Sequence, residues 1–140
     1  MEIQGYNIPD DLYYEEHHFW VRKEGDILVM GMDDFAQKLA GDIAYVQLPF
    51  EGKMLSAGNK FAKVESGKWV GKVFAPVDGE ILTSNSELEK EPGLINQDCY
   101  GSGWMYKIKP NNSSDLEMLI HEAGAIEKWM LGDIEKYKKK

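Results

Sequence analysis

The chain has 140 residues, of which 43% are hydrophobic and 29% are charged, values typical of a globular domain with a real core. Its net charge of -8 excludes the basic face that a nucleic-acid-binding protein needs. No apolar run approaches the roughly 20 residues needed to cross a bilayer, and no secretory signal is visible at the N-terminus. The single cysteine, Cys99, cannot form an internal disulfide, which predicts a cytoplasmic protein in reducing surroundings.

The first half of the chain is predicted to contain a hairpin, a helix and a further strand. Strands are expected at residues 18–22, 27–31 and 43–48. Asp33 and Asp34 each offer an N-cap for a helix that follows the hairpin. Apolar side chains recur at helical spacing until Gly41, which is expected to end this helix.

The second half continues with short strands and finishes in helices. Strands are expected at residues 60–65, 69–74, 80–83 and 104–109. Residues 92–103 are rich in Gly, Pro, Asn and Asp and predict a long ordered loop. Ser113 or Ser114 can cap a helix, and residues 125–137 predict a second one. Many short strands with turns between them indicate a mostly β fold, a small barrel or sandwich.

The motif with the clearest chemistry is a lysine at the tip of a predicted tight hairpin. The hairpin reads Val64-Glu65-Ser66-Gly67-Lys68-Trp69-Val70. Strand-like residues flank the tip on both sides, so the Lys68 ammonium group is expected to stand alone in solvent. Such a lysine suits an external enzyme that acylates it, which removes its charge. Taken alone, however, a Gly-Lys pair in a turn is most simply an ordinary surface lysine.

The surrounding sequence resembles the H proteins of glycine cleavage from about residue 13 to residue 137. The resemblance implies one carrier domain over residues 1–140, with a lipoyl hairpin at about 60–77 and a helical part at about 113–138. It also implies a flattened barrel-sandwich hybrid of the lipoyl- and biotinyl-carrier type, with a short helix after the first hairpin. The motifs that carry it are Trp20-Val21-Arg22, Asp34-Phe35-Ala36-Gln37, Gly41-Asp42, Gln47-Leu48-Pro49, Val64-Glu65-Ser66, Ala75-Pro76, Gly79-Glu80-Ile81, Pro92-Gly93-Leu94-Ile95-Asn96 and Tyr100-Gly101-Ser102-Gly103-Trp104.

The resemblance implies that lipoic acid is attached to Lys68 by a lipoate-attaching enzyme, with Glu65, Gly67 and Trp69 as supporting residues. The resulting arm ends in a cyclic disulfide that thiol exchange opens and recloses at separate active sites, including that of dihydrolipoamide dehydrogenase. The protein is then a monomeric carrier that shuttles a bound intermediate, and not an enzyme. Biotin carriers are set aside because no methionine adjoins Lys68.

Three residues raise the question of which cargo the arm carries. In glycine cleavage the family's arm holds a cationic aminomethyl group in a cleft, and a buried cation needs a carboxylate. The family supplies this charge in a Ser-His-Glu-Trp run and with an aspartate four residues after the lysine. Here His17 and Phe19 occupy the serine and glutamate positions, and Lys72 replaces the aspartate. This pattern predicts an apolar and partly cationic arm cleft.

Two interpretations of the cleft follow. The pattern resembles the H-like lipoate-binding proteins of heterodisulfide-reductase-like sulfur oxidation, which implies sulfur intermediates as cargo and a heterodisulfide-reductase-like complex as partner. In the alternative, the protein is a glycine-cleavage carrier that serves glycine decarboxylase and aminomethyltransferase. Its missing negative charge would then come from Glu15, Glu16 or Glu65. The first interpretation is favoured on these residues alone.

Cys99 and the histidines were weighed as further sites. Cys99 could be a resolving thiol that exchanges with the arm, but a loop cysteine without a redox role is favoured because no basic neighbour lowers its pKa. His17 and His18 are adjacent on a strand and therefore point to opposite faces. No Cys-rich or acid-rich pattern completes a zinc site with them. The sequence therefore predicts no metal.

Overall fold

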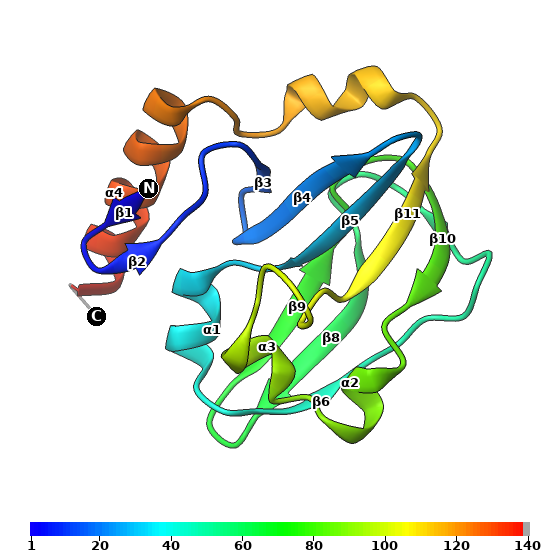
Figure 1. The fold of residues 1–140 in the computed structure, drawn as a ribbon, viewed down its shortest axis with the longest axis horizontal. Coiled ribbons are helices and arrows are strands. Elements are labelled where there is room, and N and C mark those ends of the chain that lie inside the picture. Colours follow the sequence, from blue (N-terminus) through cyan, green and yellow to red (C-terminus); the bar gives the residue numbers. More distant parts are fainter. Residues whose placement is uncertain (139–140) are drawn as a thin grey trace.

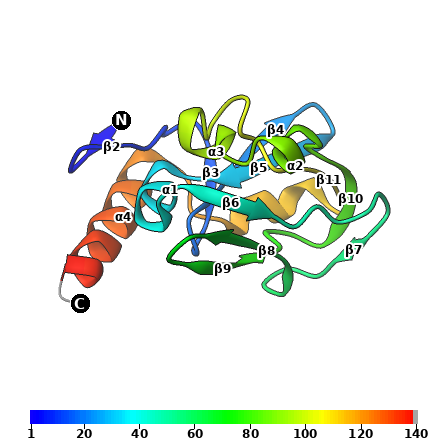
Figure 2. The same ribbon diagram turned by 90° about the horizontal axis from the view of Figure 1, so that it is seen from below.

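The computed structural model describes residues 1–138 and is built mainly from two antiparallel sheets that face each other (Figure 1, Figure 2). In spatial order, the larger sheet consists of β3 (Tyr13–Glu15), β4 (Phe19–Glu24), β5 (Ile27–Met32), β11 (Tyr106–Pro110), β10 (Gly79–Ser84) and β7 (Met54–Leu55). The smaller sheet has the order β6 (Ile43–Val46), β8 (Lys60–Ser66) and β9 (Val70–Phe74). The prediction of a mostly β, barrel-sandwich architecture is confirmed.

The main hydrophobic core lies between these two sheets. Val21 and Met30 enter it from the larger sheet, and Val64 and Val73 enter it from the smaller one, all without solvent exposure. Each such side chain contributes about 1.5–3 kcal/mol by leaving water. The core fixes the register of β8 and β9, and it thereby fixes which residues fall in the turn between them.

The helix after the first hairpin, α1 (Asp34–Ala40), begins and ends as predicted. The Asp33 carboxylate accepts a hydrogen bond from the Ala36 N–H as its N-cap, and Gly41 follows its last turn with a φ of 78°. Glycine is favoured there because a Cβ is disfavoured at positive φ.

The region predicted as a loop at 92–103 instead contains a short helix, α3 (Leu94–Gln97), which follows another, α2 (Glu87–Lys90). Ile95 and Leu88 are fully buried, so tertiary packing stabilises single turns that local composition disfavours. The first of the predicted C-terminal helices is a 3-10 helix, η1 (Ser113–Met118), with Asn112 rather than a serine as its N-cap. It buries only Leu116, too little apolar surface to support a longer helix.

A second hydrophobic cluster lies outside the sandwich, where the two ends of the chain meet (Figure 1). The last helix, α4 (Ala123–Lys138), buries Ile126, Met130 and Ile134, which lie one turn apart on one face. They pack with residues near the N-terminus, including Ile3 in the small hairpin formed by β1 (Glu2–Ile3) and β2 (Tyr6–Asn7). The cluster fastens α4 beside β4 and α1.

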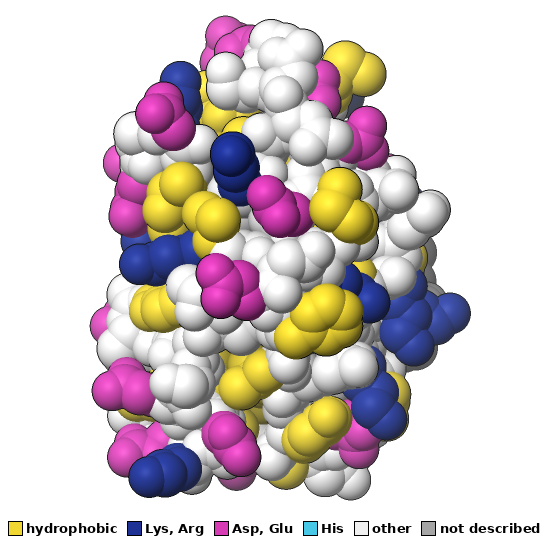
Figure 3. Space-filling model, turned by 90° about the vertical axis from the view of Figure 1, so that its right-hand side faces the viewer, with side chains coloured by type: hydrophobic (Ala, Val, Ile, Leu, Met, Phe, Trp, Pro, Cys, Tyr) yellow, Lys and Arg dark blue, Asp and Glu magenta, His cyan; other side chains and the backbone are white. Residues whose placement is uncertain are grey.

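The side of the molecule on which β7 and β10 lie carries acidic, basic and apolar side chains in alternation, without a patch of one charge (Figure 3). Among residues 1–138, no helix is long and apolar enough to cross a membrane.

Candidate functional site

Lys68 lies in the turn that joins β8 to β9. The Ser66 N–H donates to the Trp69 carbonyl at 2.8 Å and closes the turn, while the Lys68 N–H donates to Ser66 Oγ at 3.4 Å. The Lys68 side chain is exposed, and within residues 1–138 its ammonium group has no ion pair. Glu65 is held by Lys63 at 3.0 Å, so this carboxylate does not neutralise Lys68. A free amine of this kind is accessible to an acylating enzyme.

The end of α1 provides the surface next to the Lys68 side chain. A Cβ on Gly41 would lie 2.9 Å from Lys68 Cε, so the absence of a side chain there leaves room for the lysine. Ala40, Gly41, Asp42 and Gly67 surround a hollow of about 400 Å³ at Lys68. Gly41 therefore has two roles, because it also ends α1 in a conformation with positive φ.

A cavity of about 700 Å³ opens on the other side of the hairpin. It is lined by Glu16, His17, His18, Trp69, Val70, Lys72, Phe74, Asp133, Lys136 and Tyr137. Trp69 folds back over Gly71, where any Cβ would overlap the indole ring. His17 stacks on Phe74 with ring centroids 3.9 Å apart. The walls are therefore largely aromatic, and the structure brings together His17, Trp69 and Lys72, three of the residues predicted to lie near the arm.

Phe19 does not belong to this cavity, so its predicted place in the arm cleft is wrong. Its side chain is 3% exposed and packs in the main core, and it pairs with Met32 across β4 and β5. Within β4, Phe19 packs in the main core and Trp20 in the second cluster, because successive strand residues point to opposite faces. Phe19 consequently belongs to the core, whereas Lys72 belongs to the cavity.

His17, which lines this cavity, forms a closed pair with Glu15, which does not. The Glu15 carboxylate accepts from the His17 N–H at 2.8 Å and contacts His17 Nδ1 at 2.5 Å. Burial raises the pKa of Glu15, although the bonds to His17 oppose that shift. Glu15, Glu16 and His17 each bring one ligand atom within 4.8 Å of the others, but both Glu15 oxygens are already occupied by His17.

Sequence reasoning considered His18 only as a metal ligand and missed the role that the structure gives it. It is buried with a φ of 76°, and its ring lies between two carboxylates, with Nδ1 2.9 Å from Asp33 and Nε2 2.8 Å from Asp133. It also stacks on Trp129 at 4.5 Å. This network joins the N-terminus of α1, the start of β4 and α4. The predicted N-cap Asp33 was a partial signal for it, but nothing local in the sequence places Asp133 beside His18.

The network predicts that the protein is less stable at alkaline pH. Burial opposes protonation of His18, but Asp33 and Asp133 together raise its pKa above the ordinary 6.5. Its stabilisation is therefore complete below that ordinary value and is lost as pH rises through the higher folded-state pKa. Burial raises the pKa of Asp33, which acts in the same direction. We expect a lower free energy of unfolding in urea at about pH 8.5 than at about pH 6. A His18→Gln variant should show a flatter profile, and a wild-type stability that rises over this interval would contradict the prediction.

Cys99 is 7% exposed, and burial raises the pKa of its thiol to about 12. Its carbonyl accepts a hydrogen bond from Trp20 Nε1 at 2.9 Å. A buried thiol with this pKa remains protonated near neutral pH, which argues against the redox role and favours the interpretation as a structural loop cysteine.

Comparison with known proteins decides which family this site belongs to. The family described as Glycine cleavage H-protein matches residues 12–131. The chain belongs to this family. A glycine cleavage system H protein from Bacteroides fragilis is 42% identical over 118 residues, covering 84% of this chain and 94% of that protein. One from Thermus thermophilus is 43% identical over 118 residues, covering 84% and 92%.

A solved structure of a glycine cleavage system H protein from Mycobacterium marinum gives the same result for the fold. It has a TM-score of 0.70 and 35% identity, and covers 74% of this chain and 87% of that one. Members of the H-protein family carry lipoate covalently on a lysine and are carriers rather than enzymes, so this chain is a lipoyl carrier. The matched residues end at 131, whereas α4 continues to Lys138.

Proposed function

We propose that this protein is lipoylated on Lys68 and carries the aminomethyl group of glycine between the enzymes of glycine cleavage. The observation that carries the proposal is the exposed Lys68 at the tip of the β8–β9 turn, which has no ion pair among residues 1–138 and has an aromatic cavity beside it, in a chain of the H-protein family. Its partners would be a lipoate-attaching enzyme, glycine decarboxylase, aminomethyltransferase and dihydrolipoamide dehydrogenase.

The residues present fit a lipoyl group. Acylation requires that Lys68 Nζ be accessible to the attaching enzyme. The short turn and the absence of a side chain at Gly41, next to Lys68, both favour this access. When attached, the group supplies a disulfide that opens to accept cargo and recloses to release electrons. The chain's own contribution is to hold the point of attachment at a rigid hairpin and to offer walls from Trp69, Phe74 and Tyr137 that shield a bound adduct from water.

The glycine interpretation is preferred to the sulfur interpretation. The relatives that are 42% and 43% identical are named for glycine cleavage. The case for sulfur cargo rests on His17, Phe19 and Lys72, and it weakens because Phe19 lies in the core. Lys72 stays as the departure inside the cavity, and its long side chain can carry the ammonium group into solvent.

The proposal is tested by the exchange of bicarbonate into the carboxyl group of glycine. We expect lipoylated protein, mixed with a competent glycine decarboxylase, to support exchange that saturates with carrier concentration. Unlipoylated protein is the matched control and should support only background exchange. An H protein such as that of Thermus thermophilus serves as the positive control in the same assay. If that protein is active and the lipoylated chain gives only background exchange, the assignment of glycine cargo is wrong and the sulfur interpretation is favoured again.

A further inference from the structure

Resting on the proposed function, we propose that Asp133 of α4 is the carboxylate that receives the cationic aminomethyl group when the loaded arm enters the cavity. A cation moved out of water needs a nearby negative charge or several acceptors. Phe19 cannot supply one, and Lys72 adds positive charge to the cavity. The acceptor must therefore come from another residue of its wall.

Two carboxylates line the cavity within the described chain, those of Glu16 and Asp133. The Glu16 side chain is 75% exposed, so bulk water already solvates it. The Asp133 side chain is only 21% exposed, and it is held by a hydrogen bond to the buried His18. The charge of a partly buried carboxylate is screened by salt and water less than that of an exposed one. A carboxylate that is already held in one orientation also loses less conformational entropy when a ligand binds. Asp133 is accordingly the better acceptor.

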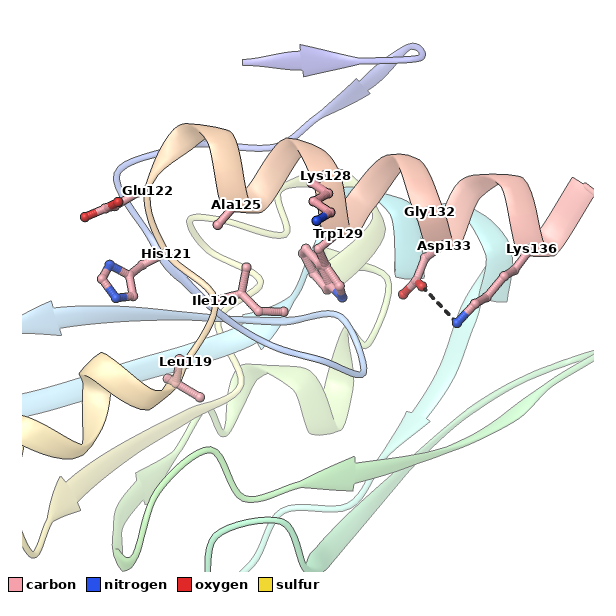
Figure 4. Close-up of a pocket in the computed structure, with 10 residues that line it drawn as sticks. All are labelled: Leu119, Ile120, His121, Glu122, Ala125, Lys128, Trp129, Gly132, Asp133 and Lys136. Atoms are coloured by element: carbon pink, nitrogen blue, oxygen red, sulfur yellow. Dashed lines mark ion pairs between the residues drawn. The ribbon is translucent and has the colours of Figure 1, made fainter.

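One Asp133 oxygen remains available for a ligand. Oδ2 lies 2.8 Å from His18 Nε2, whereas Oδ1 lies 3.8 Å from Lys136 Nζ, which is too long for a hydrogen bond. Figure 4 draws a neighbouring pocket that Asp133 and Lys136 also line, and it shows the Lys136 ammonium group pointing back along α4 toward Asp133. The Lys136 side chain is 78% exposed, so a cationic cargo can displace it from Oδ1 into solvent at little cost.

The part of the wall that carries Asp133 lies beyond the residues that match the family. Asp133, Lys136 and Tyr137 line the cavity but lie beyond residue 131. They are held there because Ile126, Met130 and Ile134 bury the opposite face of α4 against the N-terminal segment. In this chain the helix thus brings a negative charge to a cavity whose wall carries a lysine at position 72.

The test uses the full lipoylated chain, reduced with a phosphine and then loaded chemically, so that no decarboxylase is needed. Formaldehyde and ammonium condense with one arm thiol to give the thioether-linked aminomethyl group and water. After dilution, water reverses the step: the C–S bond breaks, the sulfur regains its proton, and formaldehyde and ammonium leave. The measured quantity is the rate of formaldehyde release, with an aldehyde trap in the buffer.

We expect Asp133→Asn to release formaldehyde roughly tenfold faster than the wild type, as loss of one hydrogen bond to a charged group implies. Asp133→Glu keeps the charge and should stay near the wild-type rate. Glu135→Gln removes an exposed charge from the same helix outside the cavity and should change nothing. Equal rates for Asp133→Asn and the wild type, or equal acceleration in Asp133→Glu, overturn the proposal. Because loading is chemical, neither result depends on the glycine–bicarbonate exchange that tests the proposed function.

Discussion

Replacement of Lys68 by arginine is expected to abolish lipoylation and, with it, all carrier activity. The guanidinium group keeps the positive charge but stays protonated and is not acylated. Lys68 makes no ion pair with residues 1–138, and the turn is closed by main-chain bonds between Ser66 and Trp69, so the fold should be unaffected. The measurement is the intact mass after incubation with a lipoate-attaching enzyme, ATP and lipoate, where the wild type should gain one lipoyl group and Lys68→Arg none.

The control for this experiment is Lys60→Arg, which changes an exposed lysine at the start of the same hairpin. It should be lipoylated like the wild type, because the attaching enzyme needs the lysine at the turn. A lipoyl group on the Lys68→Arg variant, or its loss from Lys60→Arg, would show that the attachment site has been assigned to the wrong lysine.

The hairpin and α1 could be predicted because their signals are local. A Ser-Gly-Lys turn between alternating strands fixes the exposure of Lys68 whatever surrounds it, and Asp33 and Gly41 mark the ends of α1 by their own backbone preferences. The same local preferences produced the error at residues 92–103. There a Gly- and Asn-rich composition favoured a loop, whereas burial of Ile95 stabilised a helical turn.

The cavity could be predicted only in part, because its walls come from distant segments. Residues close to Lys68 in sequence, Trp69 and Lys72, do line it. Phe19 was placed at the cleft because it occupies the glutamate position of the family's motif, and the resemblance alone did not show that this position faces the main core at the start of β4. Asp133 was missed because α4 reaches the site through packing against the N-terminal residues, for which no element was predicted.

His18→Ala is expected to lower the free energy of unfolding by about 3–5 kcal/mol, as when one partner of a buried charged pair is removed. Asp33 is fully buried. Without the imidazole, its Oδ2 would lose the hydrogen bond to His18, whereas its Oδ1 would still accept the bond that caps α1. Asp133 would lose its 2.8 Å contact to His18, which precedes β4, so α4 should loosen as well. Urea unfolding followed by circular dichroism at about pH 6 measures the loss, since His18 is protonated there.

His121→Ala is the matched control, because the His121 side chain is less enclosed and reaches Glu117 only at 3.4 Å. This variant should lower the free energy of unfolding by no more than about 1 kcal/mol.

The double variant His18→Ala, Asp33→Asn separates loss of the network from loss of ring packing. If the stranded Asp33 charge causes the penalty, the double variant should be less destabilised than the sum of the two single variants, because residues in direct contact are not additive. Strict additivity, or a loss for His18→Ala as small as for His121→Ala, would mean that the ring only fills space between α1 and α4.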